Sequence, residues 1–111
     1  MDKLAQYRTY ILQLLEQYKV YKTSYKEVDI QVIIDSEHDH YQLVHVGWNN
    51  KQRIHGCSLH IDIIEGKIWI QYNGTDRHVA SELVELGILK EDIVLGFQTP
   101  YRRQFTEYAV A

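Results

Sequence analysis

Hydrophobic and polar residues alternate along the middle of the chain, which is the pattern of β-strands with one buried face. The alternation is clearest from Leu59 to Ile64, at the end of a long strand that we predict to begin at Arg53. A partner strand follows from Lys67 to Tyr72. Between them lie Glu65 and Gly66, and glycine allows the positive φ that tight hairpin turns require. The sequence therefore predicts a β-hairpin around which the rest of the chain is organised.

The same alternation predicts two more strands before this hairpin. They run from Val28 to Asp35 and from Tyr41 to Trp48, and the polar loop from Ser36 to His40 joins them as a second hairpin. A short apolar stretch from Ile93 to Phe97 predicts a last strand. Gly56 lies inside the long strand, where a glycine often marks a bulge or a close approach of another backbone.

The amino-terminal part of the chain has a different period. Its apolar residues recur three or four positions apart, which lines one face of a helix; they are Leu4, Tyr7, Ile11, Leu14, Tyr18, Tyr21 and Tyr25. We predict a helix from about Lys3 to about Lys22 that packs on the sheet. The spacing also fits a coiled-coil seam, but it covers only about three heptads and offers mostly tyrosine where coiled coils use aliphatic side chains.

A second, shorter helix is predicted after the strand that ends at Tyr72. Thr75 is a favourable N-cap, and Asp76 would lie in the first turn, where the helix dipole favours an acid. The helix should run to about Leu86, and Gly87 suits the left-handed position that ends a helix. Together the elements predict an α+β fold, with a long N-terminal helix packed on an antiparallel sheet of about four to five strands and a second short helix.

Size and charge limit the classes of protein to which the chain can belong. Its 111 residues, 45% of them hydrophobic, suffice for one core, so we expect a single domain over residues 1–111. The net charge of -3 disfavours direct nucleic-acid binding, which depends on a positive surface. The only cysteine is Cys57, and no signal-peptide pattern or apolar run near about 18 residues is present. We therefore expect a cytoplasmic protein without a membrane segment.

Histidines and acidic residues in and beside the predicted strands are the candidates for chemistry. The Ser36 to His40 loop alone contains four potential metal ligands, Glu37, His38, Asp39 and His40. A small metal-dependent or hydrolytic enzyme is therefore one alternative, and it would use His38, His40, His45, His55, His60 and Asp62. Metal sites need several converging ligands, however, and turns favour polar residues for backbone reasons. We therefore assign no catalytic, cofactor-binding or metal-binding residue from the sequence.

Basic residues gather in two places. Lys19, Lys22 and Lys26 could form a stripe at the end of the first helix, although lysines there also suit solvation and the helix dipole. Arg102 and Arg103 are the only adjacent arginines. Direct DNA binding through these arginines and the lysines of the first helix is a second alternative.

The carboxy-terminal end is apolar, which is unusual for a free terminus. It contains Phe105, Tyr108 and Val110, and burying a large apolar side chain is worth about 1.5–3 kcal/mol. We expect this end to pack on the sheet or against another chain. The candidates for partner or DNA contact are mainly aromatic and basic residues of this end: Trp48, Tyr101, Arg102, Arg103, Phe105 and Tyr108.

Residues 41–111 also carry a series of short motifs in a fixed order. They are Gly47-Trp48, Arg53, Gly56, His60-Ile61-Asp62-Ile63, Gly66 to Gln71, Glu82-Leu83-Val84, Gly87-Ile88, Lys90 to Phe97, Arg103 and Ala109-Val110-Ala111. In this order and spacing the sequence resembles the XisI family, named for a controlling factor in excision of the fdxN DNA element in cyanobacteria. Two positions depart from the family pattern: Leu89 replaces a usual proline, and the turn from Asn73 to His78 replaces a more acidic one.

The resemblance implies a non-enzymatic accessory to site-specific DNA excision. It implies a companion protein of the XisH type as direct partner and a separate site-specific recombinase as an indirect one. No catalytic residues or cofactors carry over from the family. Self-association into a homo-oligomer stays open.

Overall fold

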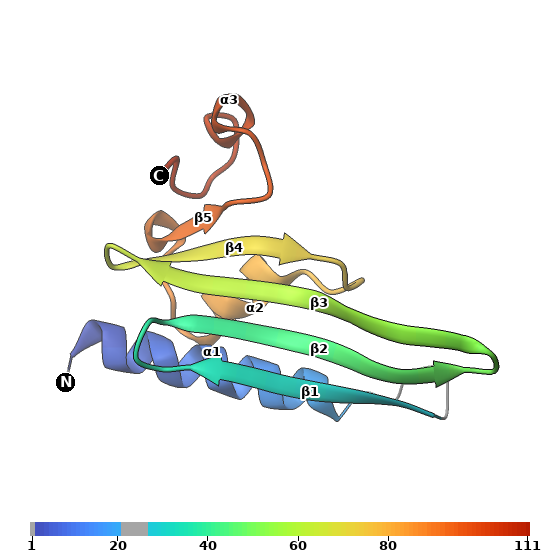
Figure 1. Ribbon diagram of the computed structural model, residues 1–111. Coiled ribbons are helices and arrows are strands. Elements are labelled where there is room, and N and C mark those ends of the chain that lie inside the picture. The colour runs from blue at the N-terminus through green and yellow to red at the C-terminus, as the bar shows by residue number, and fades with distance from the viewer. Residues whose placement is uncertain (1, 21–26) are drawn as a thin grey trace.

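The computed structural model describes residues 2–20 and 27–111. Its elements are α1 (Lys3–Lys19), β1 (Glu27–Asp35), β2 (His40–Asn49), β3 (Gln52–Ile64), β4 (Lys67–Asn73), α2 (Val79–Leu86), a 3-10 turn (Lys90–Asp92), β5 (Ile93–Leu95) and α3 (Pro100–Arg103). The five strands form one sheet in the order β1-β2-β3-β4-β5. Both α1 and α2 lie on one side of this sheet, and among the described residues no helix covers its other side (Figure 1).

The predicted α+β fold is confirmed, but the sheet is mixed rather than antiparallel. Strands β1 to β4 pair antiparallel, whereas β5 runs parallel to β4. The difference arises because α2 carries the chain back across the sheet between β4 and β5, and such a crossover produces a parallel pair.

The β3–β4 hairpin is formed as the sequence predicts. Glu65 and Gly66 are its two loop residues, and their φ angles are 50° and 81°. Positive φ at both positions belongs to the turn type whose twist matches that of the flanking strands. The loop therefore fixes which residues of β3 and β4 face each other.

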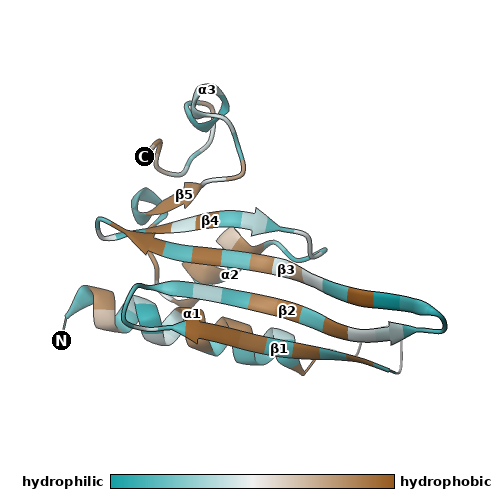
Figure 2. Ribbon diagram, in the orientation of Figure 1, coloured by the Kyte–Doolittle hydropathy of each residue, from teal (hydrophilic) through white to brown (hydrophobic). Residues whose placement is uncertain are grey.

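The helix-covered side of the sheet holds the core. Brown and teal segments alternate along β2 and β3 in Figure 2, as expected for strands with one buried face. The buried residues of α1 are Tyr7, Ile11, Leu14, Leu15 and Tyr18, and they belong to one cluster with buried residues of the strands and of α2. The prediction that the first helix packs on the sheet is confirmed. The part of that prediction that concerns Tyr21, Lys22, Tyr25 and Lys26 lies outside the described residues.

The second helix begins three residues later than predicted. It starts at Val79, and Thr75 is not its cap. Instead, the Thr75 hydroxyl accepts a hydrogen bond from the Arg77 backbone N–H, and the Thr75 N–H donates to Asn73 Oδ1. These local bonds close a turn that competes with the helix for the same backbone groups. Gly87 does end the helix, with φ of 129°.

The glycines of the strands act differently from the expectation for Gly56. A Cβ at Gly56 would meet no atom within 4 Å. The register shift between β2 and β3 lies instead at Ser58, because Leu43 pairs with Leu59 and Val44 with Cys57. A second shift, between β3 and β4, lies at Gln71, because His60 pairs with Tyr72 and Ile61 with Ile70. The close backbone approach is at Gly47, where a Cβ would lie 2.0 Å from the Glu27 carbonyl oxygen.

The carboxy-terminal segment docks only in part. The Ala109 N–H donates to the Ile93 carbonyl at 2.8 Å, and Tyr108 packs against the core. Phe105 and Val110, by contrast, are 71% and 53% exposed, so these two side chains are not buried on the sheet. Their packing against another chain stays a prediction. None of the helices in the described ranges is long and apolar enough to cross a membrane.

Candidate functional site

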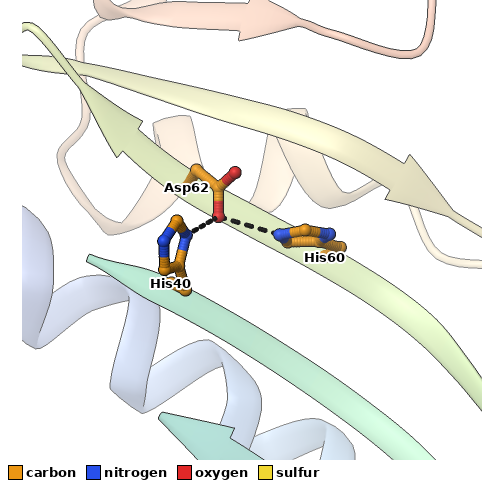
Figure 3. Close-up of side chains that lie close together, drawn as sticks. All are labelled: His40, His60 and Asp62. Atoms are coloured by element: carbon orange, nitrogen blue, oxygen red, sulfur yellow. Dashed lines mark hydrogen bonds and ion pairs between the residues drawn. The ribbon is translucent and has the colours of Figure 1, made fainter. Parts of the chain in front are cut away.

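The uncovered face of the sheet carries the single group of potential metal ligands found among the described residues. His60 and Asp62 are two positions apart on β3, so their side chains leave the strand on the same face. His40 begins β2 and is paired directly with Asp62. Figure 3 shows the three side chains together on these two strands, with the helices behind the sheet.

The Asp62 carboxylate is the centre of this group. Its Oδ1 lies 2.8 Å from Nδ1 of His40 and 2.8 Å from Nε2 of His60. Its Oδ2 accepts a hydrogen bond of 3.2 Å from Nε2 of Gln71 on β4. One ligand atom from each of His40, His60 and Asp62 lies within 4.8 Å of the other two. We call His40, His60, Asp62 and Gln71 the Asp62 cluster.

In the Asp62 cluster the carboxylate is buried, whereas the two histidines are partly exposed to solvent. The Asp62 side chain is 10% exposed, whereas those of His40 and His60 are 54% and 30% exposed. Burial alone would raise the pKa of Asp62, but the hydrogen bonds from His40, His60 and Gln71 outweigh it and lower this pKa. The hydrogen bond to Asp62 in turn raises the pKa of His40. The carboxylate is therefore charged at neutral pH.

Asp92, the other buried aspartate, has partners of another kind. It is 8% exposed, accepts a 2.6 Å hydrogen bond from the Tyr7 hydroxyl, and lies 2.7 Å from Nζ of Lys3. The same combination of a tyrosine and a permanently charged base recurs twice at half-buried carboxylates, namely Asp39 with Arg8 and Tyr41, and Glu82 with Arg77 and Tyr18. Asp62 differs because its hydrogen-bond partners are two imidazoles and an amide.

Only part of the histidine set proposed from the sequence comes together. His38 pairs with Asp35 at 2.9 Å, and Asp39 of the same turn is held by Arg8. His45 and His55 lie farther along β2 and β3, where they pair with Gly56 and Val46 and take no part in the Asp62 cluster. The spacing of His60 and Asp62 on a strand is visible in the sequence. The contribution of His40 follows only from its pairing with Asp62, and that of Gln71 from the irregular pairing of β3 with β4 between Ile70 and Tyr72.

The first of the proposed partner contacts, Trp48, lies apart from the other five. It is near the end of β2, in the part of the β2–β3 hairpin that extends beyond α1 and α2 (Figure 1). The residue is 46% exposed, and the Arg53 guanidinium lies 5.3 Å from its ring centroid. Trp48 is therefore accessible, and its ring already has a cationic neighbour.

The carboxy-terminal candidates divide into outward and inward groups. Tyr101 and Phe105 are 70% and 71% exposed and meet edge to face, with their ring centroids 5.1 Å apart. Arg102 is also exposed. We call Tyr101, Arg102 and Phe105 the α3 patch.

Arg103 and Tyr108 point inward from the same segment. The Arg103 Nε donates to the carbonyls of Leu95 and Gln98, and its guanidinium lies 5.0 Å from the Trp69 ring centroid. Tyr108 is half-buried against the core. These two side chains therefore hold the carboxy-terminal segment in place.

Comparison with known proteins identifies the lineage of the chain. The family model described as XisI protein matches residues 1–110. The chain belongs to the XisI family. Over 98% of its length it is similar, at 49% identity and a TM-score of 0.91, to all of a XisI-like protein from Anabaena variabilis ATCC 29413. A second crystal structure, of the fdxN element excision controlling factor XisI from the same strain, matches 99% of this chain and 100% of its own at 36% identity and a TM-score of 0.85.

A search of curated proteins gives no match. The family membership confirms the resemblance inferred from the motifs of residues 41–111 and extends it to the amino-terminal helix. The name of the family refers to a controlling factor rather than to a catalyst.

Proposed function

We propose that this chain controls excision of a DNA element without catalysing it, by binding a companion protein of the XisH type through the α3 patch. The observation that carries the proposal is the pair of exposed, mutually packed rings of Tyr101 and Phe105. Tyrosine, tryptophan and arginine are enriched at the energetic centres of protein interfaces. The family name supports the choice of excision control as the process.

The backbone of the α3 patch is well fixed. Thr99 caps α3, since its hydroxyl accepts a hydrogen bond of 3.2 Å from the Arg102 N–H, and Pro100 opens the helix. Arg103 ties the end of the helix to the Leu95 and Gln98 carbonyls. A patch whose backbone is already ordered loses less conformational entropy on binding than a free tail would.

The chemistry of the patch fits an apolar groove in a protein better than DNA. Each aromatic ring can bury about 150–250 Å² on association. The net charge of -3 gives the whole molecule no attraction for a phosphate backbone, and within the patch Arg102 is the one basic residue. The recombinase would then be reached indirectly, through the companion.

Binding of the purified companion to single variants tests the proposal. Tyr101→Ala and Phe105→Ala should each weaken binding about tenfold or more, which corresponds to about 1.4 kcal/mol for an interface anchor. Neither should change the melting temperature, because both side chains are exposed. Val20→Ala is the matched control, because Val20 is 77% exposed and lies at the end of α1. Calorimetry with the companion gives the affinities.

Four results would contradict the proposal. The first is that the parent chain binds no companion, and the second is that the two α3 variants bind as tightly as Val20→Ala. The third is that the parent shifts excision-site DNA at physiological salt and that Arg102→Ala loses the shift, which would favour direct DNA binding. A complex of two copies that Phe105→Ala dissociates would assign the patch to self-association.

A further inference from the structure

The Asp62 cluster presents a set of donor atoms with a recognised preference. Two imidazole nitrogens and one carboxylate oxygen suit divalent transition metals such as Zn²⁺, Co²⁺ and Ni²⁺. Mg²⁺ and Ca²⁺ prefer sites made of oxygen ligands alone. The donor atoms of the cluster therefore suit a divalent transition metal ion better than Mg²⁺ or Ca²⁺.

The spacing of the donor atoms is close to that of a bound site. Metal bonds of about 2.0–2.2 Å to nitrogen and oxygen place tetrahedral ligands roughly 3.4 Å apart. In the Asp62 cluster one nitrogen of each histidine lies 2.8 Å from Oδ1, and one ligand atom of each of the three residues lies within 4.8 Å of the other two. Small rotations of His40 and His60, which are partly exposed, would open this spacing to that of a metal site without moving β2 or β3.

The surroundings of Asp62 also match those of a metal ligand. Gln71 holds Oδ2 and leaves Oδ1 directed at the two histidines, and ligating carboxylates are commonly oriented by such an outer hydrogen bond. A divalent ion would supply at Asp62 the positive charge that Lys3 supplies at Asp92. The exposed side of the cluster leaves room for a water molecule or a partner side chain as a further ligand.

From these observations we infer that His40, His60 and Asp62 form a site for one divalent transition metal ion of the zinc type, with Gln71 as the residue that orients Asp62. The site joins β2 to β3 on the uncovered face of the sheet. Its existence does not depend on the companion or on the α3 patch. The inference concerns binding of the ion, which would stabilise the strand pair.

Titration of protein without a histidine tag tests the inference, with ZnCl₂ followed by calorimetry and CoCl₂ followed by its visible absorption. The parent should bind one equivalent of each metal, and the melting temperature should rise with the concentration of free zinc. Gln71→Ala should weaken binding about 10- to 100-fold, the usual cost of losing an outer partner. His40→Gln and His60→Gln should weaken it at least as much, because each removes a ligand.

Two controls separate a built site from general histidine affinity. His55 lies on β3 but outside the cluster, and His38 lies in the turn that precedes β2. The variants His55→Gln and His38→Gln should therefore bind zinc with the affinity of the parent. His60 is partly exposed, so its replacement leaves a folded protein even if Asp62→Asn does not. The inference is overturned if the parent shows no saturable binding. It is also overturned if His60→Gln binds zinc as tightly as His55→Gln.

Discussion

Asp62 and Asp92 are the two buried charged residues among the described ones, and they are stabilised in opposite ways. Asp92 lies in the 3-10 turn before β5, where the Tyr7 hydroxyl and Lys3 of α1 reach it. Asp62 lies on β3 and faces away from the helices, toward His40 and His60. Asp92 links the 3-10 turn to α1 through its ion pair with Lys3, whereas Asp62 is surrounded by potential metal ligands.

The different surroundings of the two aspartates indicate which of them stabilises the fold and which is available for binding. Tyr7 is 2% exposed, so its hydroxyl needs a hydrogen-bond partner inside the protein, and Asp92 supplies it. The histidines around Asp62 are partly exposed and can bond water instead. We therefore expect Asp92 to support the fold and Asp62 to be free for binding.

Removing Asp92 should have the largest effect. Asp92→Ala should lower the free energy of unfolding by about 1–3 kcal/mol, because the buried Tyr7 hydroxyl loses its acceptor. Urea unfolding measures the change. Glu91→Ala is the matched control, since Glu91 is the exposed neighbour of Asp92, and it should change stability by no more than about 0.5 kcal/mol. Equal losses in the two variants would remove the structural role of Asp92.

Acid should weaken the fold by protonating Asp92 and the two half-buried carboxylates, Asp39 and Glu82. Hydrogen bonds from Arg8 and Arg77 lower the pKa of Asp39 and of Glu82, and those from Lys3 and Tyr7 outweigh burial and lower the pKa of Asp92. A lowered pKa means that the unfolded chain binds protons first as the pH falls. The stabilisation is therefore complete above the ordinary carboxyl pKa of about 4 and is lost as the pH falls through the lowered values.

Melting temperatures measured across the acid range give this dependence. The melting temperature of the parent should decline below about pH 4, and that of Asp92→Ala should decline less steeply, because the variant has one such carboxylate fewer. Parallel curves for the parent and Asp92→Ala would show that Asp92 makes no contribution to acid sensitivity.

Removing Asp62 in the absence of metal should have the smallest effect. Asp62→Ala should lower the free energy of unfolding by less than about 1 kcal/mol, because His40, His60 and Gln71 all retain access to solvent and can bond water once the carboxylate is gone. Urea unfolding in the presence of a chelator measures this value. A loss as large as that of Asp92→Ala would mean that Asp62 is a structural residue like Asp92.

The parts of the fold that local chemistry determines could be predicted from the sequence. The Glu65-Gly66 turn defines its hairpin within two residues, and the spacing of Tyr7, Ile11 and Leu14 defines the buried face of α1. The start of α2 could not be predicted, because Thr75 takes part in a turn with Asn73 that offers the backbone the same hydrogen bonds as a helix cap. The parallel pairing of β5 depends on the path of the whole chain rather than on β5 itself.

The candidate sites were predictable to different degrees. His60 and Asp62 share a strand face by simple alternation, but His40 joins them only through the register of β2 with β3. In the carboxy-terminal segment the sequence indicated aromatic and basic residues as a group. It could not separate the exposed Phe105 from Arg103, whose guanidinium is turned inward onto Trp69. That distinction requires the packing of a segment whose partners are far away in the sequence.

The most direct test of the contrast between the two aspartates is urea unfolding of the tag-free parent, Asp62→Ala and Asp92→Ala, each with and without zinc. We predict that zinc raises the unfolding midpoint of the parent and of Asp92→Ala by the same amount, because the metal site is intact in both. Zinc should leave the midpoint of Asp62→Ala unchanged, although this variant is the more stable of the two in the absence of metal. Equal stabilisation of all three proteins by zinc, or of none, would contradict the account.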